Sequence, residues 1–441
     1  MSNHIFINKK IDNFKKKINV APDKSISIRS ILLASQAIGV SKISNLLESE
    51  DVLNTLRAIK KLGINYKKKS GNYFIEGFGL NSFSSRKRIT INAGNSGTLA
   101  RLILGLLVKS KCQIKLIGDK SLSKRDFSRV IKPLRLFGVN IQSKKNSLPI
   151  KILGTDYLRP ICYNERIGSA QVKSCIIFCA LNTPGTTQIK AKKSRNHTEQ
   201  LLKSLNYPIK VSKINNIDKI SIRGLSQFKS FKHIIPGDIS SAAFFIVLTI
   251  LSNNSEMIIK NVNINESRIG IIKILRRMGA TIKLNNKRIY KGENIANIFI
   301  KSSRKLKGIN CPSYLNSSAI DEFLIIFLVA AKAKGISTFK NLGELNKKES
   351  PRLDIAQKFL KIIGIRVERK KDNIKIFGNP KLEITKNIHI EKYLKDHRVF
   401  MMACIAALSF GGNWKIDDKD SINTSFPFFL DTLKSLGAKI N

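Results

Sequence analysis

The sequence has 441 residues, which is too long for one ordinary hydrophobic core and predicts two or three domains. Hydrophobic residues make up 42% and charged residues 25%, which excludes intrinsically disordered and collagen-like chains. The sign of the charge is unusual, because 79 Lys and Arg against 30 Asp and Glu give a formal net charge of +49. Such a charge suits nucleic acid, an anionic membrane face or acidic small substrates, but the basic residues are spread along the whole chain, as on a solvated surface.

Membrane insertion and secretion are not expected. No apolar run reaches about 18 residues, and the longest runs, 242–251 and 399–408, predict buried helices. Residues 1–18 alternate Lys with apolar residues and lack the apolar centre of a secretory signal. The six cysteines form no Cys-x-x-Cys pair and have no His at ligand spacing, so we expect no metal and a cytoplasmic protein.

A short signature recurs along the chain at the end of each of several amphipathic stretches: an apolar residue, a Gly and a second apolar residue. Asn takes the Gly position once, as it can at a left-handed helix cap. The spacings of 75, 68, 73, 85 and 73 residues define six repeat units. The central residues are Gly63, Gly138, Asn206, Gly279, Gly364 and Gly437.

Each repeat unit also contains a second, more apolar helix, which must be buried because it is apolar around most of its circumference. Polar and charged residues crowd the first turns of these helices. They can act as ordinary N-caps, or the six helix N-termini can be directed at shared anions. The helices are expected at 23–39, 94–110, 168–181, 237–252, 319–335 and 396–410.

The most informative short strings lie mainly at these helix starts, in the order 22–29, 94–98, 118–125, 169–173, 320–322, 348–352 and 396–398. In this order and at these distances the strings resemble those of the 3-phosphoshikimate 1-carboxyvinyltransferases, the EPSP synthases of the enolpyruvyl transferase family. Residues 424–427 and 436–440 are similar to that family too. The resemblance covers residues 20–440.

The resemblance implies an α/β fold of two domains, each an inside-out α/β barrel of three βαβαββ units. It places residues 1–20 and 236–441 in one domain and residues 21–235 in the other. It also implies the reaction: the 5-hydroxyl of shikimate 3-phosphate attacks C2 of phosphoenolpyruvate, C3 takes a proton, and the adduct loses phosphate. The expected partners are these two small molecules alone, with no membrane, nucleic acid unlikely to bind, and a monomeric enzyme.

Both substrates carry a phosphate and a carboxylate, which guanidinium groups bind in a bidentate manner. By resemblance, phosphoenolpyruvate is bound by Lys24, Gly97, Arg125, Gln171, Arg352 and Arg398. Shikimate 3-phosphate is bound by Lys24, Ser25, Arg29, Ser169, Ala170, Gln171, Arg195, Asp321 and Lys348.

The reaction also needs a base for the 5-hydroxyl and an acid for the methylene carbon. Asp321, expected as the second residue of a buried helix, resembles the family's proton acceptor, and Lys24 and Glu349 are the candidate donors. The sequence leaves open which group performs each step. Asp321 can instead be a helix N-terminal carboxylate, and Glu349 a partner for Arg352.

Two histidines, His197 and His397, lie beside binding arginines and are interpreted as structural or supporting residues rather than metal ligands. No cofactor is expected, because residues 77–79 lack the third glycine of a dinucleotide-binding turn and no phosphate-binding Gly-Lys-Ser/Thr loop exists.

Three residues depart from the family pattern: Asp126, Asn196 and Pro351. We expect these changes to spare the contact residues, and each of them can lower affinity or activity. Asp126 adds a negative charge beside Arg125. Gly97 follows the pattern, and family members with Ala there tolerate glyphosate because the methyl group crowds the phosphoenolpyruvate pocket.

Two alternatives remain. A UDP-N-acetylglucosamine enolpyruvyl transferase uses a cysteine on a mobile loop, whereas the comparable loop, 118–125, has none and Cys112 precedes it in an expected strand. A nucleic-acid-binding protein would explain the charge, but only 7% of residues are aromatic and no binding motif is present.

Overall fold

The computed structural model describes residues 3–83, 88–215 and 217–441. The chain divides into two compact units. Unit 1 contains the N-terminal segment through Ala21, Pro236–Arg288 and Asn294–Asn441, and unit 2 contains Pro22–Ile235 and Ile289–Glu293. The chain therefore returns to unit 2 for five residues between the two long segments of unit 1.

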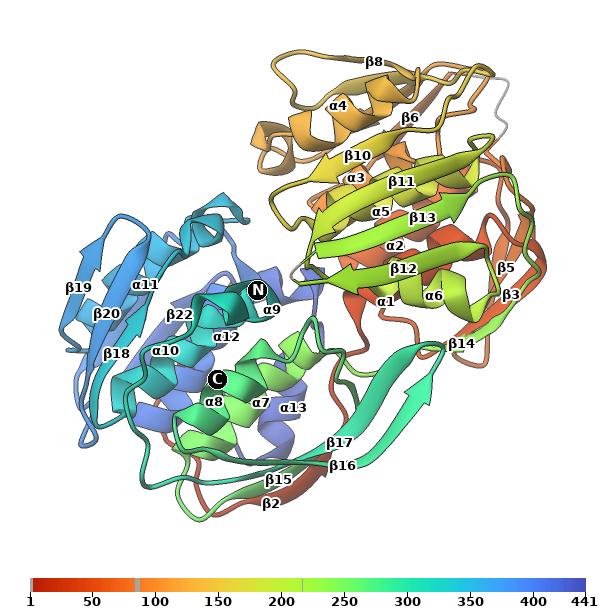
Figure 1. The fold of residues 1–441 in the computed structure, drawn as a ribbon. Helices are drawn as coiled ribbons and strands as arrows, with labels where there is room; N and C mark the ends of the chain where they lie inside the picture. Colours follow the sequence, from red (N-terminus) through yellow and green to blue (C-terminus); the bar gives the residue numbers. More distant parts are fainter. Residues whose placement is uncertain (1–2, 84–87, 216) are drawn as a thin grey trace. The chain divides into compact units, whose positions relative to one another are not determined.

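Among the described residues, unit 2 has three four-stranded sheets and two α-helices for each sheet. Figure 1 draws these elements. The helices are α1 (Lys24–Ala34), α2 (Glu50–Lys61), α3 (Gly97–Leu104), α4 (Ser128–Leu136), α5 (Ala170–Leu181) and α6 (His197–Ser204). The first sheet has the order β14 (Lys232–Ile234), β3 (Ile38–Ser44), β5 (Asn72–Phe78), β4 (Tyr66–Lys69). The second has the order β6 (Ile89–Asn92), β7 (Ile114–Ile117), β9 (Ile150–Leu153), β8 (Asn140–Ser143). The third has the order β10 (Cys162–Glu165), β11 (Thr186–Lys192), β13 (Ile217–Arg223), β12 (Ile209–Ile214).

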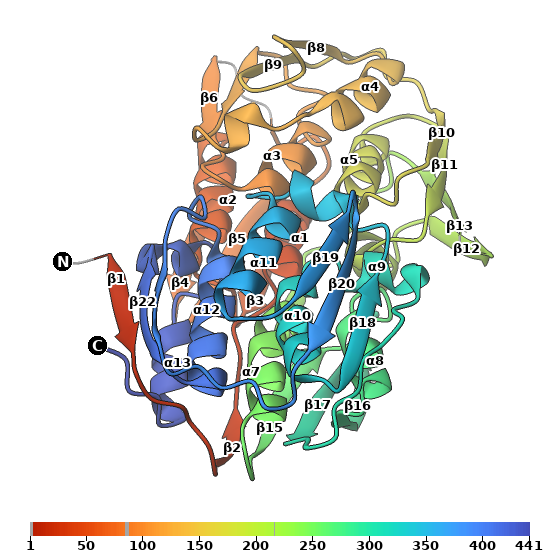
Figure 2. The same ribbon diagram turned by 90° about the vertical axis from the view of Figure 1, so that its left-hand side faces the viewer.

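Unit 1 repeats this plan, with strands β18, β20 and β19 side by side in Figure 2. Its helices are α7 (Ile239–Leu251), α8 (Gly270–Arg277), α9 (Asn316–Ala319), α10 (Phe323–Lys332), α11 (Arg352–Ile362), α12 (His397–Phe410) and α13 (Phe429–Ser435). One sheet has the order β16 (Thr281–Tyr290), β17 (Glu293–Lys301), β15 (Glu256–Asn263), β2 (Lys15–Ile18). The others have the orders β18 (Gly335–Phe339), β20 (Asn373–Gly378), β19 (Val367–Lys370) and β1 (His4–Ile7), β22 (Asn413–Asp417), β21 (Asn387–Ile390).

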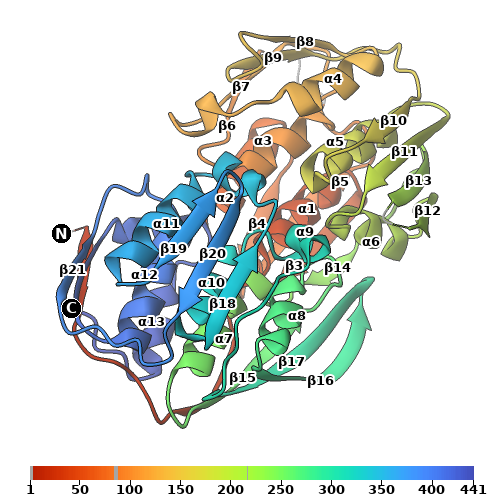
Figure 3. The same cartoon turned by 60° about the vertical axis from the view of Figure 1, so that its left-hand side comes forward.

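In both units one helix of each repeat is buried and the sheets are amphipathic. Every residue of α7 is buried, and α7, α10 and α12 contact one another at the centre of unit 1 (Figure 3). Strand residues instead alternate between buried and exposed, as in β11, where Thr187, Ile189 and Ala191 are buried. The helices therefore form the inner layer and the sheets the outer layer, and the predicted buried helices at 242–251 and 399–408 are confirmed.

The predicted helix C-termini are confirmed by their backbone conformation. The five signature glycines and Asn206 all have positive φ, between 56° and 100°, directly after α2, α4, α6, α8, α11 and α13. This left-handed conformation costs a residue with a Cβ free energy, so the signature marks where each helix ends. The local sequence thus determines the boundaries of the repeats.

Some expectations about local structure are wrong. The helices expected at 23–39 and 94–110 end earlier, at Ala34 and Leu104. The helix expected at 319–335 is interrupted, because α9 ends at Ala319 and α10 begins at Phe323. Asp321 therefore lies in the turn between the two helices rather than in a helix. Cys112 lies in a bend before β7, not in a strand. Across the described ranges, no helix has both the length and the apolar character needed to cross a bilayer.

Candidate active site

The buried helices of unit 2 begin with side chains that cap their own backbones. Asp23 Oδ1 accepts a hydrogen bond from Ile26 N at 2.9 Å at the start of α1. Ser96 and Ser169 accept from the third residue on at the starts of α3 and α5, at 3.3 and 3.4 Å. The N-capping interpretation, one of the two given, is therefore present at these three helices, and each cap satisfies only one of the free amide groups of its helix terminus.

Lys24, the first residue of α1, is paired with a carboxylate that the sequence analysis missed. Its Nζ lies 2.8 Å from Oδ2 of Asp51, near the start of α2, and the two side chains are 21% and 9% exposed. This ion pair fixes the ammonium group at the helix start while leaving part of it accessible. The signal was weak, because Asp51 stands in the other helix of the repeat, outside the motif strings.

Gly97, Arg125 and Gln171 are brought together around a further missed residue, Arg101. Arg101 Nη1 donates to Gln171 Oε1 at 3.0 Å and to the carbonyl of Gly97 at 3.3 Å. Arg125 Nη2 donates to Asn95 Oδ1 at 2.7 Å. A Cβ at Gly97 would lie 2.9 Å from Arg101 Nη1 and 3.0 Å from Arg125 Nη1. Arg101 is four residues after Gly97, so helical spacing could have identified it.

The extra charge of Asp126 is taken up locally. Its two carboxylate oxygens accept hydrogen bonds from the backbone N and the hydroxyl of Ser128, both at 2.7 Å. Burial raises the pKa of this carboxyl group, but these hydrogen bonds and the nearby Arg129 and Arg101 outweigh burial and lower it. The carboxylate is thus bound at the start of α4 by Ser128.

Arg29 is built into the helix packing of unit 2. It is 2% exposed, and its Nε and Nη2 donate to Thr198 Oγ1 at 2.8 Å and to Ser174 Oγ at 3.0 Å. Its Nη1 donates to Ser25 Oγ at 2.6 Å. Arg29 therefore joins α1 to α5 and α6 and orients Ser25. Arg195, Ser169 and Ala170 are partly exposed at neighbouring helix starts.

The central group of unit 1 is a carboxylate surrounded by cations. Asp321 Oδ1 lies 3.2 Å from Lys348 Nζ and 3.4 Å from Arg352 Nη1, and Asp321 Oδ2 lies 3.9 Å from Arg398 Nη2. Arg398 Nη1 also donates to the backbone carbonyl of Asp321 at 2.8 Å. Asp321 is 12% exposed and Lys348 27%, so this group is accessible on one side.

Arg352 is buried and holds the group together. Its side chain is 1% exposed, with Nε 2.8 Å from Asp396 Oδ2 and Nη2 bonded to Glu349. Burial disfavours its charge, but Asp396, Glu349 and Asp321 outweigh burial and raise its pKa. Burial raises the pKa of Asp396, and Arg352 outweighs this and lowers it. The pairing of Glu349 with Arg352, one of the two interpretations given for Glu349, is present.

Arg398 rests on a buried network that the sequence analysis did not find. Its Nη1 lies 3.6 Å from Oε1 of Glu322, which also accepts a hydrogen bond from Ser240. Arg268 Nη2 donates to Ser240 Oγ at 2.7 Å and to Asp238 Oδ1 at 3.1 Å. These residues are contributed by α7, by the segment before α8 and by the segment before α10, which is why no single string identified them.

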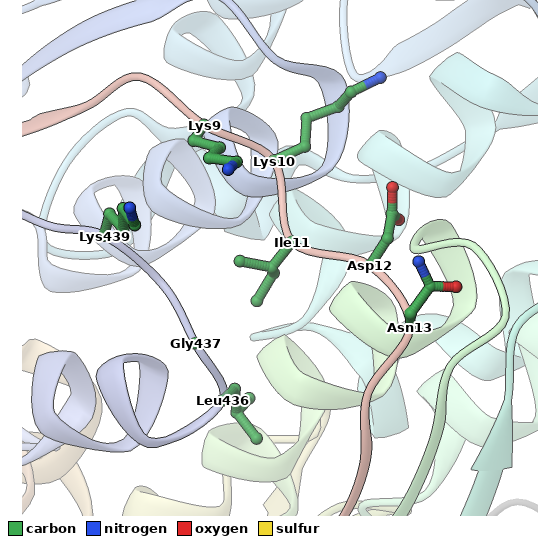
Figure 4. A pocket seen from close by; sticks show the side chains of 8 residues that line it. All are labelled: Lys9, Lys10, Ile11, Asp12, Asn13, Leu436, Gly437 and Lys439. Atoms are coloured by element: carbon green, nitrogen blue, oxygen red, sulfur yellow. The ribbon is translucent and has the colours of Figure 1, made fainter.

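A hollow and a side-chain cluster elsewhere among the described residues contain none of the predicted site residues. A hollow of about 370 Å³ in unit 1 is lined by residues 9–13 and by Leu436, Gly437 and Lys439, none of them a predicted site residue (Figure 4). In the part of the chain that the structure describes, His389, Glu391 and Asp417 are grouped closely enough to hold a metal ion. Asp417 lies 3.0 Å from His389 and Glu391 lies 3.1 Å from Lys392, so these carboxylates already have partners.

Residues 8–433 match the family model described as EPSP synthase (3-phosphoshikimate 1-carboxyvinyltransferase). The chain belongs to the EPSP synthase family. A 3-phosphoshikimate 1-carboxyvinyltransferase of Ruthia magnifica subsp. Calyptogena magnifica is 42% identical over 438 residues, 99% of this chain and 98% of that relative. The enzyme of the same name from Zymomonas mobilis is 38% identical over 439 residues, 98% of this chain and 96% of that relative.

Solved structures agree with this family assignment. An EPSP synthase from Acinetobacter baumannii superposes with a TM-score of 0.88 and 36% identity, covering 99% of both chains. The enolpyruvyl transferase NikO from Streptomyces tendae superposes with a TM-score of 0.76 over 100% of this chain and 99% of its own, at 12% identity, which bears on the fold alone. The predicted enolpyruvyl transferase-like α/β fold is confirmed.

Proposed function

We propose that this member of the EPSP synthase family transfers the enolpyruvyl group of phosphoenolpyruvate to the 5-hydroxyl of shikimate 3-phosphate, as a step of aromatic amino-acid biosynthesis. The products are 5-enolpyruvylshikimate 3-phosphate and inorganic phosphate. The observation that carries the proposal is Asp321, a carboxylate placed among Lys348, Arg352 and Arg398 in a chain of this family. A base surrounded by anion-binding cations is what proton removal from an anionic substrate requires.

The reaction is an addition followed by an elimination. In the first step the 5-oxygen bonds to C2 of phosphoenolpyruvate, Asp321 takes the hydroxyl proton, and C3 receives a proton from Lys24 or Glu349. In the second step C3 returns a proton to the group that supplied one, and the C2–O bond to phosphate breaks. The leaving phosphate takes the proton held by Asp321, and the double bond is restored. The number of protons on the enzyme is the same before and after.

The arginines bind the charges of both substrates. In this proposal Arg125, Arg352 and Arg398 hold phosphoenolpyruvate with Lys24, Gly97 and Gln171. Shikimate 3-phosphate is bound by Ser25, Arg29, Ser169, Ala170, Arg195 and Lys348, and by Lys24, Gln171 and Asp321. Arg29 acts partly through Ser25, because its guanidinium is already bonded to that hydroxyl.

The test is phosphate release by the purified protein with both substrates, with each alone and with phosphoenolpyruvate plus a UDP-sugar. We expect turnover only with shikimate 3-phosphate and phosphoenolpyruvate together. Asp321→Asn should lower kcat by about 10²- to 10⁴-fold, because a general base usually contributes a rate factor of this size. Asp431→Asn, the same change at an exposed position of α13, is the matched control and should not alter kcat.

Turnover with phosphoenolpyruvate plus the UDP-sugar, and none with shikimate 3-phosphate, would contradict the proposal. It would favour a UDP-N-acetylglucosamine enolpyruvyl transferase. Salt-sensitive binding of DNA, with no turnover, would favour a nucleic-acid-binding function instead. We also propose that the enzyme is a cytoplasmic monomer. Light scattering from the purified protein tests the oligomeric state, and cell fractionation tests the location.

A further inference from the structure

The tip of the hairpin formed by β16 and β17, Ile289–Glu293, belongs to unit 2, whereas the two strands belong to a sheet of unit 1. The turn consists of Lys291 and Gly292, whose φ values are 51° and 77°. Two consecutive left-handed residues are the mark of the tight turn that fits the twist of a hairpin. The turn therefore fixes where Tyr290 and Glu293, on either side of it, are placed.

The tip packs closely against the other residues of unit 2. Tyr290 Oη accepts a hydrogen bond from the backbone N of Ile234 at 3.0 Å. The Tyr290 ring lies 5.8 Å from the ring of the buried His233. A Cβ at Gly292 would lie 3.0 Å from the carbonyl of Gln200 on α6, so only glycine allows this approach.

Glu293 forms a buried hydrogen bond with the first residue of α6. Its Oε1 lies 2.7 Å from Nδ1 of His197, and the two side chains are 4% and 1% exposed. An ionised carboxylate only accepts hydrogen bonds, so Nδ1 donates. A buried charge is costly without a partner, and removing one member of such a pair leaves the other uncompensated.

His197 follows Arg195 by two residues, and the next two residues of α6 are anchored as well. Thr198 Oγ1 accepts from Arg29 at 2.8 Å, and Glu199 Oε1 lies 2.7 Å from the buried Lys173. The three consecutive residues 197–199 thus connect α6 to three different elements. Glu293 is the one of these anchors that lies outside residues 22–235.

We propose that Glu293 is a positioning residue for Arg195, acting through His197. The inference rests on the proposed function, in which Arg195 binds shikimate 3-phosphate. Glu293 fixes the start of α6, and the start of α6 fixes the backbone from which the Arg195 side chain extends. Without the contact between Glu293 and His197, the Arg195 guanidinium loses its alignment with shikimate 3-phosphate. A small misplacement of a binding group lowers both rate and affinity strongly.

The test is steady-state kinetics on Glu293→Ala and Glu293→Gln. In Glu293→Ala we expect the KM for shikimate 3-phosphate to rise by roughly 10- to 100-fold, with the KM for phosphoenolpyruvate unchanged. Glu293→Gln keeps an acceptor oxygen for His197 and should give an intermediate KM. Tyr290→Phe removes the hydrogen bond from Ile234 N and is the matched control, with no selective change expected.

A double-mutant cycle with Arg195→Ala decides whether the effect passes through Arg195. If it does, Glu293→Ala adds little to the loss caused by Arg195→Ala. An additive loss, an equal rise in both KM values, or the same rise in Tyr290→Phe would overturn the inference. If Glu293→Ala does not fold, Glu293→Gln decides: a selective rise supports the inference and a wild-type KM overturns it. Absence of turnover in the wild-type protein would instead overturn the proposed function.

Discussion

The substitution Gly97→Ala places one methyl group beside the guanidinium groups of Arg101 and Arg125. The new Cβ would lie 2.9 and 3.0 Å from their Nη1 atoms, whereas ordinary contacts begin at 3.4 Å, so each nitrogen must move by about 0.4 to 0.5 Å. Arg101 is held by Gln171 and by the carbonyl of Gly97. Arg125 is held by Asn95 Oδ1 at 2.7 Å, so we expect both guanidinium groups to shift.

The guanidinium groups are the free ends of flexible side chains and can shift, but a binding group misplaced by about 1 Å can cost about 10²-fold in rate. If Arg125 binds phosphoenolpyruvate, the KM for that substrate should rise by about 5- to 150-fold, and inhibition by glyphosate should weaken in parallel. Stability should not fall, because Gly97 begins α3 and is absent from the positions with positive φ. Replacing a glycine in an ordinary conformation by Ala usually adds about 0.4–1 kcal/mol.

The assay is phosphate release at varied phosphoenolpyruvate concentration, with and without glyphosate, alongside thermal unfolding. Gly105→Ala is the contrasting control, because its Cβ would lie 2.3 Å from the backbone carbonyl of Cys175, which cannot swing aside. That variant should lose stability without a selective change in KM. A folded Gly97→Ala enzyme with wild-type KM and wild-type glyphosate inhibition would refute this reasoning.

Three further predictions concern buried ionisable side chains. Arg352→Met should lower the free energy of unfolding by about 3–5 kcal/mol, because it leaves Asp396 buried without its partner, and urea unfolding measures this. Lys173→Met should lower the free energy of unfolding by a similar amount, because it leaves Glu199 buried without its partner. Adding Glu199→Leu should restore part of this stability. A further loss of stability in the double variant would argue against a buried pair. Burial lowers the pKa of His233 to about 4 from the usual 6.5, so its contribution to stability is complete above pH 6.5 and disappears as the pH falls toward 4. Unfolding measured from pH 7 to pH 4 should show a smaller decline in His233→Gln, and equal declines would count against the assignment.

The distribution of acidic residues explains how a chain of net charge +49 builds these groups. Several of its 30 Asp and Glu are buried beside cations or helix termini, including Asp23, Asp238, Glu322 and Asp396. There they cap helices and orient the basic side chains that remain partly accessible. The excess positive charge is left on the surface.

The sequence by itself determined the features that depend on neighbouring residues. The left-handed Gly and Asn positions end their helices because only such residues adopt positive φ cheaply. Asp23, Ser96, Ser169, Asp238 and Asp396 cap their helices because the side chain reaches an amide two or three residues ahead. The repeat, the buried helices and the order of the motif strings follow from the same local rules.

The tertiary structure alone decided the partners of the charged groups. Lys24 with Asp51, Arg352 with Asp396 and Glu293 with His197 join residues that are far apart in the chain, and no local periodicity specifies such pairs. Burial then fixes their geometry, because an unpaired charge inside the protein is unfavourable. The interruption between α9 and α10 was hidden for a similar reason: residues 319–335 are apolar enough to predict a continuous helix, whereas the contacts of Asp321 with Lys348, Arg352 and Arg398 are made from a turn.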